Sequence, residues 1–455
     1  MHKLSTLDTL FLRLERPHAP FHVGALSLLR PPADAPEDFG ARLAARLNNA
    51  RRPGSPFNRR VVRRRGLDCW ETVGDFDLGR HFVHIALKSP AASRNLPQLV
   101  SRLHGVPLDH AHPLWCTYLI DGLEDGRIAT YSKIHHAVVD GIAGLRLMLK
   151  SMSPDEGTSR AMPAPWQPPS RAVAAADVSN AGSAAARIGT SIAMAARAAA
   201  STRVVAGQLQ QTLRDYRSGH PQMVTSFQAP RCLFNQPIGA ARQFALRSIC
   251  AARIRRVAER LGGGANDVVL ALCAGALRGY LLARQALPDR PLIAAVPVST
   301  RADDGDTGNQ VAAVLVDLAT HRSDPVARFQ AIKACMDYQK ARVRQMTATE
   351  LLAYSAATLA PGLLTLLPGA RRTVANVVIS HVPGPRQPMY WQGCLLEGLY
   401  PASLLLDGFA LNITLVSRHD AVDFGVLACS RGVPQLPRLL GRLEHAMREL
   451  ERGTR

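Results

Sequence analysis

Residues 127–150 read RIATYSKIHHAVVDGIAGLRLMLK, and this stretch sets the local structure of the first half of the chain. Residues 127–134 alternate between larger apolar and polar side chains in their second half, which predicts a β-strand. Residues 142–150 carry apolar side chains on one face at helical spacing, which predicts a helix. The sequence therefore predicts a strand that enters a glycine-terminated turn and continues as a helix.

The turn itself, HHAVVDG from His135 to Gly141, has the residue types of a general-base site. Adjacent strand residues point to opposite faces of a sheet, so only one of His135 and His136 can face a given cleft. A histidine can take the proton of an alcohol that attacks a carbonyl, and a thioester needs no covalent enzyme intermediate. Asp140 could orient an imidazole or pin the turn, and Gly141 would supply a backbone conformation that a side chain would block. On spacing alone, such a histidine pair is more often structural than catalytic.

A metal site at the histidine pair is disfavoured. Neighbouring strand residues cannot easily share one ion, and no cluster of carboxylates or cysteines accompanies them. Other common motifs are absent from the sequence: there is no GxSxG nucleophile elbow and no GK dipeptide of a phosphate-binding loop. The glycines at 262–264 lack the dinucleotide-binding spacing.

The rest of the chain predicts two layered α/β domains with an active site at their junction. Residues 151–172 hold five prolines and few large apolar side chains, as expected of an extended linker. Residues 174–216 are rich in alanine and predict a helix that either connects the domains or lies on a membrane surface. The expected division is 1–150, 151–239 and 240–455. Further predicted helices are 265–282 and 436–450, and predicted strands are 292–298, 311–318, 374–380, 411–417 and 422–428.

The composition favours a globular protein of a reducing compartment. The chain has 455 residues, of which 47% are hydrophobic and 20% charged, enough for a sizeable core. Its eight cysteines are scattered without a CxxC pair, which argues against a disulfide framework. The N-terminus lacks an apolar run of signal-peptide length, and the uncharged stretch 351–370 is interrupted by prolines and glycines. We therefore expect a cytoplasmic protein without a membrane span.

The charge balance is strongly basic, with a formal net charge of +20 and seven arginines within residues 51–65. Such a field fits nucleic acid, anionic lipid or a phosphate-rich cofactor such as coenzyme A, and it also fits a solvated basic face. Aromatic residues are only 5% of the chain and do not interleave with the arginines, which disfavours single-strand nucleic-acid binding.

Beyond single motifs, the chain resembles the bacterial bifunctional wax ester synthase/acyl-CoA:diacylglycerol acyltransferase family along nearly its whole length. Many separate blocks occur in the family's order, which makes the resemblance far more specific than HHxxxDG alone. The blocks are 7–15 (LDTLFLRLE), 22–24 (HVG), 107–109 (PLD), 113–115 (PLW), the histidine motif, 266–270 (NDVVL), 297–301 (PVSTR) with 308–309 (GN), 382–385 (VPGP), 400–403 (YPAS) and 411–414 (LNIT).

This resemblance implies a chloramphenicol-acetyltransferase-like fold of two lobes that form a tunnel, with the histidine motif at its centre. It implies transfer of a long acyl chain from acyl-CoA, as co-substrate, to a fatty alcohol or a diacylglycerol, with no permanently bound cofactor and no metal. In the family's pattern His136 is the base, His135 supports it, Asp140 is mainly structural, and Asn266 assists near the active site. A peripheral position on an anionic membrane or on lipid inclusions follows from such acceptors, without a role for nucleic acid.

The chain departs from the family at two positions. The family commonly has asparagine where this chain has His381, and tyrosine after Ser417 where this chain has Arg418. Both departures concern the lining of the second lobe and bear on acceptor preference.

Three alternatives stay open at the level of sequence. His135 and Asp140 also satisfy the H-x4-D motif of glycerolipid acyltransferases, which would make His135 the base. Condensation enzymes that use carrier-protein thioesters share HHxxxDG. A basic scaffold that binds lipid or nucleic acid without catalysis would explain the charge alone.

Overall fold

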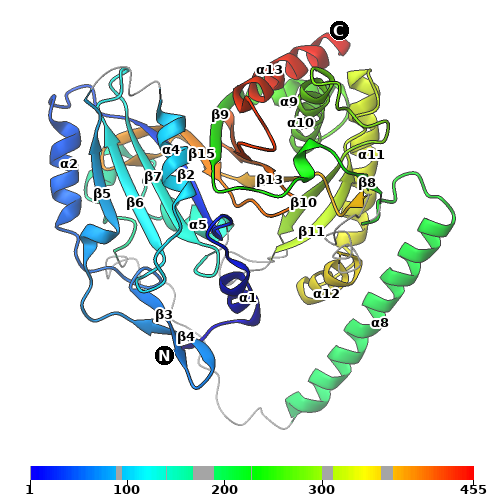
Figure 1. The fold of residues 1–455 in the computed structure, drawn as a ribbon, viewed down its shortest axis with the longest axis horizontal. Coiled ribbons are helices and arrows are strands. Elements are labelled where there is room, and N and C mark those ends of the chain that lie inside the picture. The colour runs from blue at the N-terminus through cyan, green and yellow to red at the C-terminus, as the bar shows by residue number, and fades with distance from the viewer. Residues whose placement is uncertain are drawn as a thin grey trace.

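Two six-stranded mixed sheets lie side by side in the computed structural model, one in each lobe (Figure 1). The structure describes residues 2–88, 95–139, 141–167, 189–226, 228–299, 311–359 and 372–454. The expected two-lobed α/β architecture with mixed sheets is confirmed.

The first lobe is built around β7, the strand that carries the histidine motif. β7 (Ile128–His135) confirms the strand predicted at 127–134, and α5 (Gly141–Leu149) confirms the helix that follows the turn. Side chains on both faces of β7 are buried, because helices and neighbouring strands cover them. The sheet order is β14 (Tyr390–Trp391), β15 (Cys394–Ala402), β2 (His22–Arg30), β7, β6 (Trp115–Asp121) and β5 (Phe82–Ala86), and the lobe's other helices include α2 (Phe39–Asn48) and α4 (Leu96–Gly105).

The first lobe also recruits segments far along the chain. β15 pairs antiparallel with β2, so residues beyond 390 complete a sheet otherwise built from residues 22–135. Part of the expected linker is no linker: it contains α6 (Glu156–Arg160), and the buried indole of Trp166 donates a hydrogen bond to the Ala50 carbonyl at 2.8 Å. Apolar contacts of Trp166 with the core outweigh the local effect of the prolines. The rest of the expected linker, 168–172, lies outside the described residues.

The second lobe follows the predicted pattern of strands and helices closely. β13 (Val377–Pro383) lies between β10 and β16 and runs parallel to both. It starts three residues later than predicted. α10 (Ala265–Leu282) is the predicted buried helix, and it packs between α11 and α13. The remaining strands and helices are β9 (Arg242–Cys250), β10 (Ile293–Ser299), β11 (Val311–Asp317), β16 (Leu411–Ser417), β17 (Ala421–Cys429), α9 (Ala251–Arg260), α11 (Pro325–Val343) and α13 (Leu436–Gly453).

Smaller elements flank the lobes. α1 (Thr6–Leu14) begins after Ser5, whose hydroxyl accepts the backbone N–H of Asp8. The helix expected at 174–216 is α8 (Gly189–Arg217), which packs against α12 (Ala348–Leu359), and residues 174–188 lie outside the described part. Short strands are β1 (His2–Lys3), β3 (Arg59–Arg64), β4 (Leu67–Thr72), β8 (Ala229–Pro230) and β12 (Arg372–Thr373), and η1 (Leu78–Arg80) and η3 (Leu233–Asn235) are 3-10 helices.

One helix in the described part of the chain, α10, is long and apolar enough to cross a membrane, and 67% of that stretch is buried inside the second lobe. All eight cysteines are free thiols.

The lobes meet along α4, where the Ser101 hydroxyl accepts the backbone N–H of Phe244 from β9 at 2.8 Å.

Candidate active site

The end of β7 places the two histidines of the motif in different surroundings. The backbone N–H of His135 donates to the Leu114 carbonyl at 2.9 Å, and that of His136 donates to the Phe21 carbonyl at 2.8 Å. The side chain of His135 is fully buried, whereas that of His136 is half-buried. Of the two imidazoles, only His136 therefore retains access for a substrate atom.

The buried ring of His135 is fixed in one tautomer. Its Nδ1 accepts a hydrogen bond from the backbone N–H of Ala137 at 3.0 Å, so the proton of the neutral ring sits on Nε2. Nε2 faces Oε2 of Glu15 at 3.6 Å. His135 therefore has no free lone pair with which to take a proton from an alcohol.

Glu15 is the residue that sequence reasoning missed. Its Oε1 accepts the backbone N–H of Phe21 at 2.8 Å, and its Oε2 accepts Nε2–H of His110 at 2.5 Å. Burial alone would raise the pKa of Glu15, but the hydrogen bond from His110 and the neighbouring His135 ring, 3.6 Å away, hold that pKa well below its usual range. Phe21 in turn accepts the backbone N–H of His136, so one carboxylate organises both histidines of the motif.

α1 lies directly over the half-buried histidine. The Phe11 ring meets the His136 ring edge-on, with 5.0 Å between centroids, and also contacts the ring of Phe21 at 5.8 Å. Phe11 and Glu15 are four residues apart, so the same end of α1 supplies an apolar wall and a charged anchor. Both residues fall in the LDTLFLRLE block, but the sequence offered no signal that they contact the motif.

Glu15, His110 and His135 also have the ligand types of a metal site, since their ligand atoms lie within 4.8 Å of one another. The tautomer of His135 argues against that assignment, because a metal needs a lone pair where Nε2 carries the proton. The residues present do not fit a metal, and the cluster is a carboxylate that is hydrogen-bonded to His110 and lies beside the His135 ring.

Behind β7 lies a second buried polar group that supports the strand. The Lys133 ammonium donates to the carbonyls of Leu103 and Val106 at 2.8 and 2.6 Å, at the C-terminal end of α4. Burial lowers the pKa of Lys133 to about 8. Nε2–H of His22, which pairs with His135 across the sheet, donates to the His104 carbonyl at 2.7 Å. These contacts join the motif strand to the helix between the lobes.

The remaining predicted site residues are Asp140, Gly141 and Asn266. Asp140 lies outside the described residues. The reason given for Gly141 is wrong: its φ is not in the left-handed region, and a Cβ added there would meet no atom within 4 Å. Gly141 opens α5, where a helical backbone accepts any small residue. Asn266 stands at the start of α10 in the second lobe.

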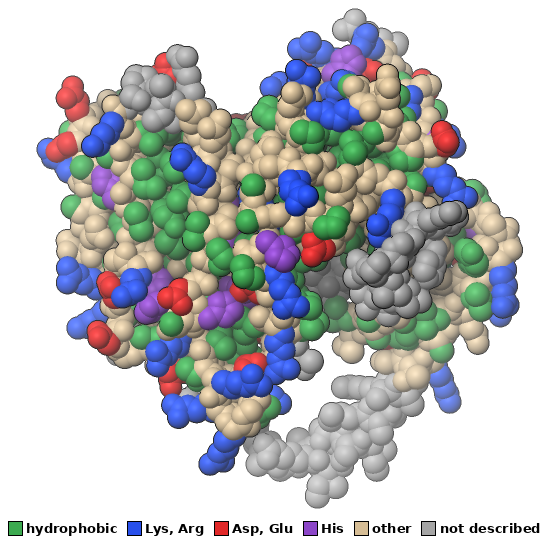
Figure 2. Space-filling view, in the orientation of Figure 1, with side chains coloured by type: hydrophobic (Ala, Val, Ile, Leu, Met, Phe, Trp, Pro, Cys, Tyr) green, Lys and Arg blue, Asp and Glu red, His purple; other side chains and the backbone are tan. Residues whose placement is uncertain are grey.

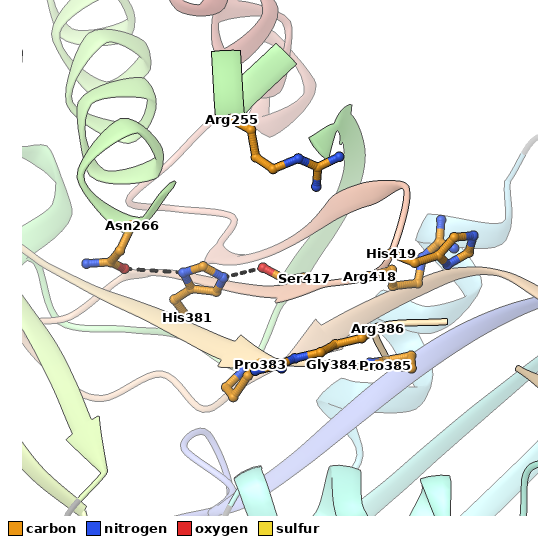
Figure 3. Close-up of a pocket in the computed structure, with 10 residues that line it drawn as sticks. All are labelled: Arg255, Asn266, His381, Pro383, Gly384, Pro385, Arg386, Ser417, Arg418 and His419. Carbon is orange, nitrogen blue, oxygen red and sulfur yellow. Dashed lines mark hydrogen bonds between the residues drawn. The ribbon is translucent and has the colours of Figure 1, made fainter. Parts of the chain in front are cut away.

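A pocket of about 400 Å³ opens beside Asn266, between the ends of β13 and β16 (Figure 3). Oδ1 of Asn266 lies 3.2 Å from Nδ1 of His381, and Nε2 of His381 lies 2.5 Å from Oγ of Ser417. His136 does not line this pocket. Val382, next to His381, and Leu145 of α5 belong to the same apolar cluster, which includes residues of both halves of the chain.

The second departure, Arg418, belongs to a buried ion pair. Its Nε donates to Oδ2 of Asp423 at 2.6 Å, and its guanidinium also donates to the Glu397 carbonyl at 2.7 Å. The same Asp423 oxygen accepts the backbone N–H of Leu399 at 2.8 Å. Because Glu397 and Leu399 lie on β15, this arginine fastens the sheet of the first lobe to β17 of the second.

The fold defines a two-lobed α/β protein with one mixed sheet in each lobe, and solved structures share this fold. The chain superposes on the starter condensation domain of rhizomide synthetase, solved with C8-CoA and Leu-SNAC, with a TM-score of 0.60 over 100% of this chain and 94% of that one, at 13% identity. At that identity the likeness shows the fold alone. The wax ester synthase/diacylglycerol acyltransferase from Marinobacter aquaeolei VT8 superposes with a TM-score of 0.80 at 36% identity, over 100% of both chains.

Sequence comparison defines the particular family. Residues 4–269 match the wax ester synthase/diacylglycerol acyltransferase catalytic domain, and residues 307–451 match the WS/DGAT C-terminal domain. The chain is 40% identical to O-acyltransferase WSD of Acinetobacter baylyi, over 99% of this chain and 97% of that one. It is 42% identical to a putative diacylglycerol O-acyltransferase of Mycobacterium tuberculosis, over 99% and 100%. The chain belongs to the wax ester synthase/diacylglycerol acyltransferase family, and the predicted O-acyltransferase function is confirmed.

Proposed function

We propose that the protein transfers the acyl group of acyl-CoA to a lipid hydroxyl, and that His136 is the general base that takes the proton of this hydroxyl. The observation that carries this proposal is the unequal burial of the two histidines at the end of β7. His135 is sealed and its ring nitrogens are directed at Ala137 and Glu15. His136 is half-buried under Phe11, in an apolar setting that suits a long acyl chain or alcohol.

The reaction needs one proton carrier and no covalent intermediate. The hydroxyl oxygen of the acceptor attacks the thioester carbonyl carbon while the imidazole of His136 takes the hydroxyl proton. The tetrahedral intermediate then collapses, the carbon–sulfur bond breaks, and the CoA thiolate leaves with the proton from the imidazolium. The carboxylate of Glu15 keeps His135 and the backbone around Phe21 in place during both steps.

The geometry argues against the H-x4-D alternative. That reading makes His135 the base, but His135 is 0% exposed and carries its proton on Nε2. The net charge of +20 supports attraction of the anionic acyl-CoA, independently of which lipid accepts the acyl group.

A direct test offers the purified protein palmitoyl-CoA with hexadecanol or a diacylglycerol, and measures free CoA and ester together. We expect ester formation, and we expect His136→Ala to reduce its rate by about 10²- to 10⁴-fold, the usual contribution of a general base. His445→Ala, which removes an exposed histidine on α13, is the matched control. Ester formation by folded His136→Ala at the control rate would overturn the assignment.

We further propose that the enzyme works as a peripheral protein on anionic membranes or lipid inclusions, docked through α1. Three leucines lie on one exposed side of this helix, Leu7 at 37% exposure and Leu10 and Leu14 at 47% each, and they define the α1 leucine face. An exposed apolar stripe beside basic residues is typical of a membrane-surface helix. Phe11 of the same helix contacts His136, so acceptors in a bilayer would lie near the base.

A basic hairpin adjoins the α1 leucine face. Arg13 of α1 lies 3.5 Å from Asp68 of β4, which places the hairpin β3–β4 against this helix. Figure 2 shows Lys and Arg side chains gathered over the region where Figure 1 places β3, β4 and α1. The hairpin tip carries Arg64 and Arg65 beside the exposed Leu67. This arrangement is complementary to anionic headgroups around an apolar acyl layer.

Co-sedimentation with vesicles of phosphatidylcholine and phosphatidylglycerol tests this docking surface. We expect Leu10→Ser/Leu14→Ser to weaken binding at least tenfold, and Leu282→Ser, a comparably exposed leucine at the end of α10, to bind like the parent. Equal binding by the two variants would show that α1 does not dock.

A further inference from the structure

A serine, a histidine and an asparagine form a hydrogen-bonded chain on the wall of the pocket in the second lobe (Figure 3). Ser417 ends β16, His381 lies near the end of the parallel neighbour β13, and Asn266 stands at the start of α10. All three side chains are partly exposed and line the pocket. The proton transfer proposed at His136 passes through none of these three side chains.

The hydrogen bonds fix the direction of the chain. The Asn266 oxygen can only accept, so Nδ1 of His381 carries the proton and donates it at 3.2 Å. Nε2 of the neutral ring is then an acceptor, and the Ser417 hydroxyl donates to it at 2.5 Å. Burial lowers the pKa of His381 to about 4, so the ring is neutral at physiological pH. A hydroxyl that donates to an oriented imidazole is the arrangement that activates a serine nucleophile.

The surroundings suit an anionic acyl substrate. Arg255 reaches from α9 into the pocket above Ser417, and Arg386 and His419 also line it (Figure 3). Two arginines that line the same pocket would attract a negatively charged substrate. A volume of about 400 Å³ leaves room for an acyl ester or thioester group.

We propose that Ser417, His381 and Asn266 form a second catalytic site, a slow esterase or thioesterase that hydrolyses acyl-CoA or a related anionic acyl ester. Ser417 Oγ attacks the carbonyl carbon and its proton passes to Nε2 of His381. The carbon–sulfur bond breaks, and CoA leaves with that proton. Water then attacks the acyl-serine, gives its proton to His381, and the carboxylic acid departs as Ser417 recovers the proton. Asn266 is a positioning residue.

The choice of acyl-CoA as substrate rests on the proposed function, but the activation of Ser417 does not. The first arm of the test therefore uses a fluorophosphonate, which reacts with activated serines, and locates the adduct by mass spectrometry. We expect labelling at Ser417, no labelling there in Ser417→Ala, and at least tenfold slower labelling in His381→Asn. Ser380→Ala, the strand neighbour of His381, is the matched control and should label like the parent protein.

The second arm measures palmitate released from palmitoyl-CoA without an acceptor, in the His136→Ala background. Hydrolysis that persists there and disappears on adding Ser417→Ala supports the second site, whatever happens to ester formation. An unlabelled Ser417 in the folded parent protein overturns the proposal. So does hydrolysis that is unchanged by Ser417→Ala, and so does an equal labelling rate in His381→Asn, which would leave the three residues a structural contact only.

Discussion

Each lobe brings a histidine to the end of a sheet strand, but the two imidazoles have opposite electrostatic surroundings. In the first lobe the Glu15 carboxylate lies beside the rings of His110 and His135. In the second lobe the ring nitrogens of His381 contact the Asn266 amide and the Ser417 hydroxyl, both of which are neutral. A nearby negative charge stabilises a positive imidazolium, whereas a neutral, buried shell opposes it. The Glu15 carboxylate therefore favours a charged ring at His110, whereas the neutral partners of His381 do not.

The ion pairs of the two regions also differ in how deeply they are buried. Arg418 and Asp423 are buried, with side chains 4% and 0% exposed, whereas in the pair of His110 and Glu15 the histidine is 44% exposed and the carboxylate 9%. Removing one partner of a buried pair leaves a charge without compensation, and removing one partner of an exposed pair costs little. Three substitutions in these two regions should therefore differ in the size of their effects.

The largest effect is expected from Arg418→Met. It leaves the Asp423 carboxylate buried without its guanidinium, and we expect a loss of about 3–5 kcal/mol in the free energy of unfolding. Urea denaturation followed by circular dichroism measures it. Arg386→Met, at an exposed position of the same pocket, should change stability by no more than about 0.5 kcal/mol. Equal stability of the two variants would show that the ion pair does not fasten the lobes.

Glu15→Gln should have the next largest effect. The amide can still accept the Phe21 N–H but carries no charge toward His110 and His135. We expect kcat for ester formation to fall about 10- to 100-fold, because small displacements of a base are costly, with little change in KM for palmitoyl-CoA. Glu449→Gln on α13 is the surface control. A rise in KM without a fall in kcat would show that Glu15 serves substrate binding.

The smallest effect is expected from His110→Asn, and it should depend on pH. The hydrogen bond with Glu15 raises the pKa of His110 above its usual 6.5, so its stabilising charge is fully present below 6.5 and lost as pH rises through the folded value. The pKa of Glu15 is lowered from its usual 4.5, so its contribution is present above 4.5 and lost as pH falls. Besides Glu15, His110 faces Asp109 and His135.

The stability difference between the parent protein and His110→Asn should therefore be largest between pH 4.5 and 6.5 and shrink toward pH 9. Because His110 is partly exposed, the difference should stay below about 1 kcal/mol. His112→Asn, two residues away, controls for the loop. A difference that grows with pH would mean that the ring is neutral in the folded protein.

The spacing of apolar residues correctly predicted those helices and strands whose burial follows a regular pattern along the chain. β7, α10 and α13 match their apolar spacing because each buries one face, or both, along a continuous run, and α5 packs a partly buried face against the core of the first lobe. The prediction of an extended linker was wrong around Trp166, because the buried indole holds this segment against the first lobe despite its prolines. Local composition cannot show such a contact.

The site was predicted only as far as the motif itself. Glu15 and His110 are 95 residues apart in the chain, and Asn266 and His381 are 115 apart, so their contacts exist only once the sheets have formed. The role expected for Gly141 failed because the turn has room for a side chain there. The sequence predicted the histidine motif at the end of one strand. The residues that contact this motif are brought to it by the tertiary fold.

The pH dependence of single-turnover ester formation distinguishes His136 from any other base in the protein. With palmitoyl-CoA and hexadecanol bound, the parent rate should rise with pH as one imidazole loses its proton and then level off. His136→Ala should lose both that rise and at least about 100-fold of the plateau rate, while its circular dichroism spectrum stays that of the parent. A folded His136→Ala variant that keeps the same pH profile and a rate within a few-fold of the parent would contradict the account.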